Sequence, residues 1–169
     1  MPFFNKLKGV LSFSNSGLIA VDLSDNSIEM LELQQTSKTP KIKACARREI
    51  PGNLIKAGKI INFNRLASEL SGNFKNGKFK HNNCILAVPD QSVYFTIFKS
   101  DKVNKNIKKE ILEKAQEQLP IDIKNIYYDF MYNANDEIFF TAVDKNIIKQ
   151  YIKLFKKAGL NLKSIDIES

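Results

Sequence analysis

Short stretches of alternating hydrophobic and polar residues open the chain, and this period of two predicts β-strands. The first three strands are expected at residues 17–23, 27–34 and 41–50. A polar turn at residues 24–26 joins the first two, because Asp and Asn side chains bond to nearby backbone groups and stabilise tight turns. In the third strand, four residues are expected to face inward: Ile42, Ala44, Ala46 and Ile50.

A helical spacing follows after residue 62, where apolar residues recur three and four positions apart. Asn62 is suited to cap this helix, and its apolar positions are Phe63, Leu66, Ala67, Leu70 and Phe74. The next run, residues 84–88 (CILAV), is continuously apolar, as expected of a strand covered on both faces, and Pro89 ends it. These elements predict one compact α/β unit.

The following fifty residues predict a second, smaller unit of a strand, a helix and a hairpin. The expected elements are a strand at 92–98, a helix at 106–119 and hairpin strands at 126–132 and 137–143. Pro120 stops the helix, whose apolar face consists of Ile107, Ile111, Ala115 and Leu119.

The last part of the chain predicts a helix at 145–158 and a strand at 160–167. Asp144 is expected to cap this helix and Gly159 to close it. Its apolar face is expected to be Ile147, Ile148, Tyr151, Ile152 and Phe155. We interpret the second unit as an insertion, so that residues 1–92 and 144–169 form one domain and residues 93–143 the other.

The net charge of +8 raises the question of nucleic-acid binding, but the composition argues against it. Of the 26 basic residues, 23 are lysine, whereas readers of bases and phosphates rely on the planar, bidentate guanidinium group. The 17 asparagines favour a compositional bias as the source of the lysines. We expect no nucleic-acid partner.

Location and redox state are inferred from features the sequence lacks. No stretch approaches the roughly 18 apolar residues of a spanning helix, and residues 1–17 do not resemble a signal peptide. Cys45 and Cys84 have no partner at CxxC spacing, so both are expected to be reduced, small core residues of a cytoplasmic protein.

No arrangement of residues indicates catalysis. The only histidine, His81, lies in a polar loop, and no phosphate-binding GxxxxGK[ST] or zinc-binding HExxH motif occurs. We therefore expect neither an enzyme nor a metal site in this chain.

Aromatic residues are dense in the second unit, and strand neighbours such as Tyr94 and Phe95 must lie on opposite faces. The single helix of this unit can cover one face, so the other either packs on the first unit or forms a binding surface. The residues concerned are Tyr94, Phe95, Phe98, Tyr127, Tyr128, Phe130, Tyr132, Phe139 and Phe140.

The last predicted helix carries lysines in one stripe, with no acid between residues 145 and 163. Two interpretations are open: a solvated basic face, or a surface that docks to an acidic partner or to anionic lipid. The stripe consists of Lys145, Lys149, Lys153, Lys156 and Lys157.

Five segments, in order, resemble the first half of PilM, a type IV pilus assembly family related to FtsA in the actin-like ATPase superfamily. They are GLIAVDLSDNSIEMLEL, IPGNLIKAGKIIN, ILAVPDQSVYF, EKAQEQLPIDIKNIYYDF and YIKLFKKAGLNLKSIDIES. The resemblance covers residues 18–169. It implies an α/β, actin-like (ribonuclease-H-like) mixed-sheet subdomain 1A with an inserted strand-helix-strand-strand subdomain 1C.

The resemblance also implies a phosphate-binding turn, at Asp22, Ser24, Asn26 and Ser27. Family members usually have glycine at the position of Ser24, and glycine lets backbone approach a phosphate closely. An ordinary polar hairpin turn is the alternative. We expect no cofactor for this chain alone; ATP and Mg²⁺ are implied for a longer, two-half protein, in which Asp22 and Asp166 would approach each other.

For partners, the resemblance implies a groove between 1A and 1C that accepts the N-terminal cytoplasmic peptide of a PilN-like membrane protein. Its residues are expected to be Pro89, Gln91, Val93, Tyr94 and Phe95. The chain would then be a cytoplasmic scaffold beside the inner face of the membrane, attached to it through partners, with self-association left open. The alternative function is half of a nucleotide-binding, polymer-forming FtsA-like ATPase.

Overall fold

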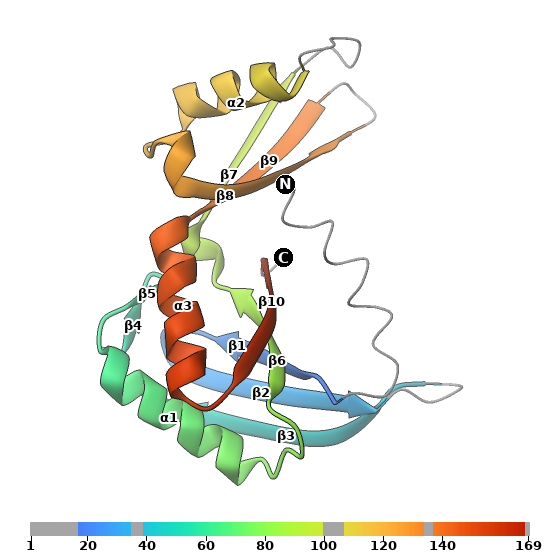
Figure 1. Cartoon of the computed structure of the whole chain (residues 1–169), viewed down its shortest axis with the longest axis vertical. Helices are drawn as coiled ribbons and strands as arrows, with labels where there is room; N and C mark the ends of the chain where they lie inside the picture. Colours follow the sequence, from blue (N-terminus) through green and yellow to red (C-terminus); the bar gives the residue numbers. More distant parts are fainter. Residues whose placement is uncertain (1–16, 35–38, 100–106, 134–136, 168–169) are drawn as a thin grey trace.

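Two larger β-sheets, besides one two-stranded hairpin, organise the described residues, as the computed structural model in Figure 1 shows. The structure describes residues 17–34, 39–99, 107–133 and 137–167. A five-stranded sheet has the order β10-β6-β1-β2-β3, and a three-stranded sheet has the order β7-β9-β8. The strands of the larger sheet are β1 (Ile19–Leu23), β2 (Ser27–Gln34), β3 (Lys41–Glu49), β6 (Asn83–Val88) and β10 (Asn161–Ile167).

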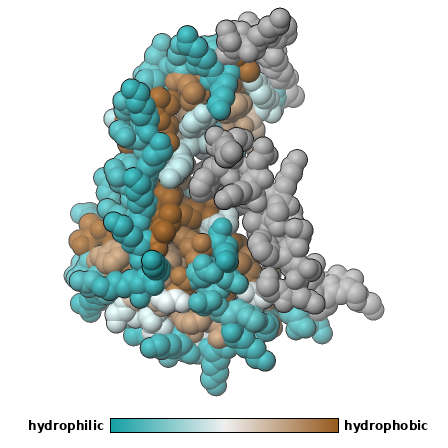
Figure 2. Space-filling model, in the orientation of Figure 1, coloured by the Kyte–Doolittle hydropathy of each residue, from teal (hydrophilic) through white to brown (hydrophobic). Residues whose placement is uncertain are grey.

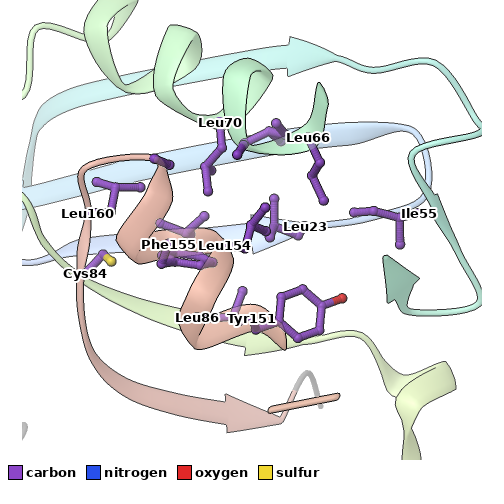
Figure 3. Packing of buried hydrophobic residues seen from close by; sticks show 14 of the residues in the cluster. Leu23, Ile55, Leu66, Leu70, Cys84, Leu86, Tyr151, Leu154, Phe155 and Leu160 are labelled. Atoms are coloured by element: carbon purple, nitrogen blue, oxygen red, sulfur yellow. The ribbon is translucent and has the colours of Figure 1, made fainter. Parts of the chain in front are cut away.

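The five-stranded sheet is mixed. Strands β1, β2 and β3 are antiparallel neighbours, whereas β6 runs parallel to β1 and β10 parallel to β6. Helices α1 (Phe63–Asn76) and α3 (Lys145–Lys157) both cover the same face of this sheet (Figure 1). Between them and the strands lies the first core, in which Leu70 of α1 and Phe155 of α3 approach Leu23 and Leu86 (Figure 3).

Both helices begin at the predicted caps. The Asn62 side chain accepts a hydrogen bond from the backbone N–H of Arg65 at 3.2 Å, and Asp144 accepts one from Asn146 at 2.7 Å. Gly159 follows α3 with φ of +82°, a conformation that favours glycine. These bonds satisfy backbone donors that a helix leaves free at its first turn.

The three-stranded sheet is antiparallel, with β9 (Glu137–Asp144) between β7 (Val93–Lys99) and β8 (Ile126–Tyr132). Helix α2 (Ile107–Gln118) packs on one face and closes a second core, whose buried residues are Phe98, Ile111, Ala115, Ile126, Ile138, Phe140 and Ala142. The two cores have no buried residue in common. The predicted fold class is confirmed, while the division at residues 92 and 143 stays a prediction.

A small hairpin was not predicted. Strands β4 (Ile55–Lys56) and β5 (Lys59–Ile60) pair between β3 and α1, in a segment to which the sequence pattern assigned no element. Its turn residues Ala57 and Gly58 have φ of +50° and +69°, as in the tight turns that match the twist of a hairpin. A Cβ atom on Gly58 would lie 1.8 Å from Ser92 Oγ, so the hairpin contacts the junction between the two sheets.

Three predictions of burial are wrong, each for a local reason. Ile42 is 68% exposed, because a register shift between Glu32 and Leu33 places it outside the inward row. Cys45 points to the uncovered face of the sheet and is exposed. On α3, Ile152 is 48% exposed and Leu154 is buried in its place.

Among the described residues, helices cover strand β6 on one face only, contrary to the sequence-based expectation. Cys84, Leu86 and Val88 are buried under the helices, whereas Ile85 and Ala87 are half-buried on the opposite face. None of the helices in the described ranges is long and apolar enough to cross a membrane.

Candidate functional site

A narrow pocket lies where the two sheets meet, at the carboxyl ends of the parallel strands β6 and β10. Its volume is about 20 Å³, room for about one water molecule and too little for a nucleotide. Four elements besides β6 contribute, and the lining residues are Val88, Tyr127, Tyr128, Asp129, Thr141, Ala142, Val143, Ile148, Ile165 and Asp166.

Above this pocket, the face of the three-stranded sheet that α2 does not cover carries large apolar side chains. Phe95, Ile97 and Met131 are 58%, 46% and 66% exposed. The rings of Phe95 and Phe139 lie 5.9 Å apart between centroids. Contiguous exposed apolar residues of this kind mark binding sites.

The strand register connects this face to the pocket. Phe95, Thr141 and Asp129 form one row across the sheet, and Val93, Val143 and Tyr127 form the row nearest the five-stranded sheet. The β8 and β9 members of both rows line the pocket, whereas Val93 and Phe95 of β7 extend the rows beyond it. We call the pocket together with these two rows the inter-sheet groove.

Two strands that border the groove are also sheet edges. Strand β8 ends the three-stranded sheet and β10 ends the five-stranded sheet. Edge strands present backbone N–H and C=O groups that an added strand can pair with. The groove therefore combines apolar side chains with the backbone groups that an extended peptide needs.

Of the five predicted partner-binding residues, two belong to the inter-sheet groove and three lie outside it. Val93 and Phe95 belong to the groove rows, and the pocket begins at Val88. Pro89 and Gln91 lie in or beside a 3₁₀ turn (Asp90–Ser92) and do not line the pocket. Tyr94 packs against the second core, on the opposite side of β7 from Phe95.

Several groove residues were not predicted as binding residues, although a signal existed for some. Asp129 and Thr141 lie on the same face of the predicted hairpin as Tyr127, which belongs to the aromatic set that the sequence left open as a binding surface, so this face could have been assigned to them. Ile148 and Ile165 come from α3 and β10, and local sequence does not indicate that these elements approach the hairpin.

The predicted phosphate-binding turn joins β1 to β2 and is closed by its own hydrogen bonds. The Ser24 hydroxyl accepts from the backbone N–H groups of Asn26 at 3.3 Å and Ser27 at 3.0 Å. The Asp25 carboxylate accepts from the N–H of Ala57 at 3.1 Å. Amides that would cradle a phosphate are thus engaged within the turn, an arrangement that favours the polar hairpin alternative.

Asp22 and Asp166 lie on the uncovered face of the five-stranded sheet, on either side of Ala87. Two strand spacings, about 10 Å, separate them. The two carboxylates therefore lie on either side of Ala87 and do not contact each other. Burial raises the pKa of Asp22, and the neighbouring Glu29 carboxylate raises it further. In the described part of the chain, no group of three or more metal-ligating side chains occurs.

Comparison with known proteins places these features in a family. Residues 20–169 match the family model of the type IV pilus assembly protein PilM. The chain superimposes on a structure of a PilM-PilN type IV pilus biogenesis complex with a TM-score of 0.77 and 15% identity. That alignment covers 91% of this chain and 48% of that one.

A second similar structure is the cytoplasmic domain of EpsL, an inner membrane component of the type II secretion system of Vibrio cholerae. It aligns with a TM-score of 0.59 and 9% identity, over 89% of this chain and 57% of that one. No curated protein matches the sequence. The chain thus spans about half the length of these structures. By its match over residues 20–169, the chain belongs to the PilM family of type IV pilus assembly proteins.

Proposed function

We propose that this chain is a cytoplasmic scaffold component of a type IV pilus machine and acts by binding an extended peptide, not by catalysis. The inter-sheet groove carries this proposal, because it offers an apolar floor bordered by β8 and β10, the strands at which the two described sheets end. The partner is proposed to be the N-terminal cytoplasmic segment of a PilN-like membrane protein. The similar structure of a PilM-PilN complex supports this class of partner.

The chemistry of the groove suits a short peptide with alternating apolar side chains. Backbone groups of the peptide would pair with β10, and every second side chain would lie against the face of the three-stranded sheet that carries Phe95, Thr141 and Val143. Affinity is expected to be modest, since ordering a free peptide consumes much of the contact energy. Such binding would hold the chain at the inner face of the membrane through its partner.

Fluorescence anisotropy with a labelled PilN-like N-terminal peptide tests this proposal. Phe95→Ala removes an exposed ring and should weaken binding at least tenfold, about 1.4 kcal/mol, with little change in the thermal midpoint. Thr141 lies on the central strand β9, in the middle of the row formed with Phe95 and Asp129. Thr141→Arg places a long side chain there and should abolish binding. Tyr94→Ala is a poorer probe than the sequence suggested, because its ring packs against the second core.

A matched control removes an equally exposed apolar side chain elsewhere. Ile61→Ala, which is 59% exposed, should leave the peptide affinity unchanged. If Phe95→Ala and Thr141→Arg both bind the peptide like the wild type, the groove is not the peptide site.

A further inference from the structure

Helix α3 has a basic side opposite its buried side. Lys149, Lys153 and Lys156 are exposed, at spacings of four and three residues that place them along one face. The buried residues, among them Ile148 and Tyr151, face the sheet instead. A continuous hydrophilic surface runs along α3 in Figure 2.

The basic side continues onto the start of α1. Lys157 Nζ donates a hydrogen bond to Asn64 Oδ1 at 2.9 Å and lies 5.9 Å from the centre of the Phe63 ring. Arg65, the next residue of α1, is exposed. Because these partners of Lys157 are uncharged, they do not neutralise the positive charge of its ammonium group. We define the basic surface as Lys149, Lys153, Lys156, Lys157 and Arg65.

Acidic groups do not neutralise this surface. Helix α3 contains no Asp or Glu, and the one acid of α1, Glu69, is paired with Arg48 at 2.6 Å. Among the described residues, the ion pairs join β2 to β3, β3 to α1 or positions within α2, and none includes a lysine of α3. Five positive charges therefore face solvent together.

Apolar side chains lie within and beside the basic surface. Ile152, 48% exposed, lies one helical turn from both Lys149 and Lys156, at the border between the basic side and the apolar stripe of α3, and Ile61, 59% exposed, lies two residues before α1. An apolar side chain bordered by lysines matches the boundary between lipid headgroups and acyl chains, where both find favourable partners.

We propose that the basic surface binds an anionic lipid bilayer directly, which goes beyond peptide binding in the groove. The charges are spread over two helices, and lysine ammonium groups on flexible stems suit a diffuse anionic surface better than one discrete ligand. A nucleic acid would share the charge complementarity, but its phosphate backbone offers no apolar layer for Ile152, whereas acyl chains do. The basic side and the groove-lining Ile148 are on different sides of α3, so both surfaces can be occupied together.

Co-sedimentation with vesicles tests the proposal, using equimolar phosphatidylglycerol and phosphatidylcholine against phosphatidylcholine alone. The protein should bind the anionic vesicles alone and should be released at about 1 M salt, where the Debye length falls to about 3 Å. The triple variant Lys149→Gln, Lys153→Gln, Lys156→Gln should bind about a hundredfold more weakly, about fivefold per lysine. Its peptide affinity should not change, so this test is independent of the groove.

A charge-matched control separates the surface from the net charge. Lys41→Gln, Lys80→Gln, Lys108→Gln removes three exposed lysines from other parts of the fold and should bind vesicles like the wild type. Ile152→Ser should weaken vesicle binding several-fold and leave binding to heparin, a soluble polyanion, unchanged. Equal losses for the two triple variants, or binding to heparin without binding to anionic vesicles, would overturn the proposal.

Discussion

Tyr151 connects α3 to the β4–β5 hairpin through a buried hydrogen bond. Its ring is fully buried, and its hydroxyl donates a hydrogen bond to the Gly58 carbonyl at 2.9 Å. Burial raises the pKa of the phenol, and the nearby Asp25 carboxylate raises it further, so the hydroxyl keeps its proton and remains a donor. The same glycine approaches Ser92, so this contact helps to fix the junction between the two sheets.

We expect Tyr151→Phe to destabilise the protein by about 1–3 kcal/mol, because the Gly58 carbonyl is left buried without its partner. Urea denaturation followed by circular dichroism would measure this change. The same substitution at the 40% exposed Tyr132 should cost less than about 0.5 kcal/mol. Equal effects at both positions would mean that the hydroxyl of Tyr151 contributes nothing specific.

For single residues, the sequence pattern predicted burial correctly at the centre of each apolar face and less well at the edges of that face. Leu66, Leu70 and Phe155 are buried as predicted. Ile152 was assigned to the apolar face of α3, yet helix rotation places it at the edge of the apolar stripe. Leu154 fills the core instead, and only packing against the sheet distinguishes the two.

Among the elements, the turn between β1 and β2 has the clearest consequence for nucleotide binding. Because Ser24 already accepts from the amides of Asn26 and Ser27, we expect this chain to show no micromolar affinity for Mg-ATP. Isothermal titration calorimetry should record no saturable heat. A clear binding isotherm would contradict this expectation and would favour the alternative of half a nucleotide-binding ATPase.

The uncovered face of the five-stranded sheet carries a row in which Asp22 lies opposite Glu29. The pKa of Asp22 is raised in the folded state, so the native protein binds this proton more tightly than the unfolded chain does. The free energy of unfolding therefore falls as the pH rises from the unfolded pKa, about 3.9, through the folded one. Asp22→Asn should be more stable than the wild type at pH 7 and equally stable below about pH 3.

Urea denaturation of Asp22→Asn at both pH values measures this difference. The gain at neutral pH should shrink in a Glu29→Gln background, since that substitution removes one of the two causes of the raised pKa. A variant that is less stable than the wild type at pH 7 would show that the ionised carboxylate is stabilising.

The longer helices and strands were predicted better than the short hairpin and the contacts between elements. The order of strands and helices and both N-caps follow from periodicity and from single polar residues. The β4–β5 hairpin was missed because each strand has two residues, too few for a period to appear. The groove was predicted only in outline, since it depends on how β8, β10 and α3 approach one another.

At the scale of the molecule, the two cores should respond separately to mutation. Leu70 and Ile111 are fully buried, each in a different core, and substitution by alanine should cost about 2–5 kcal/mol at either site. Ile111→Ala should speed amide hydrogen exchange in β7, β8 and β9 and leave β1 and β6 protected, whereas Leu70→Ala should do the reverse. Uniform loss of protection in both variants would indicate one cooperative unit.

The position of β6 between β1 and β10 determines when the larger sheet can be completed. Strand β6 ends at Val88 and β10 ends at Ile167, 79 residues later (167 − 88). At a synthesis rate of about 5–20 residues per second, this interval lasts on the order of 4–16 s. During that time one edge of the apolar strand β6 has no neighbour, and such edges invite association with other chains. The unit that is made first is therefore finished last, and the nascent chain is most vulnerable to aggregation while its second sheet is being synthesised.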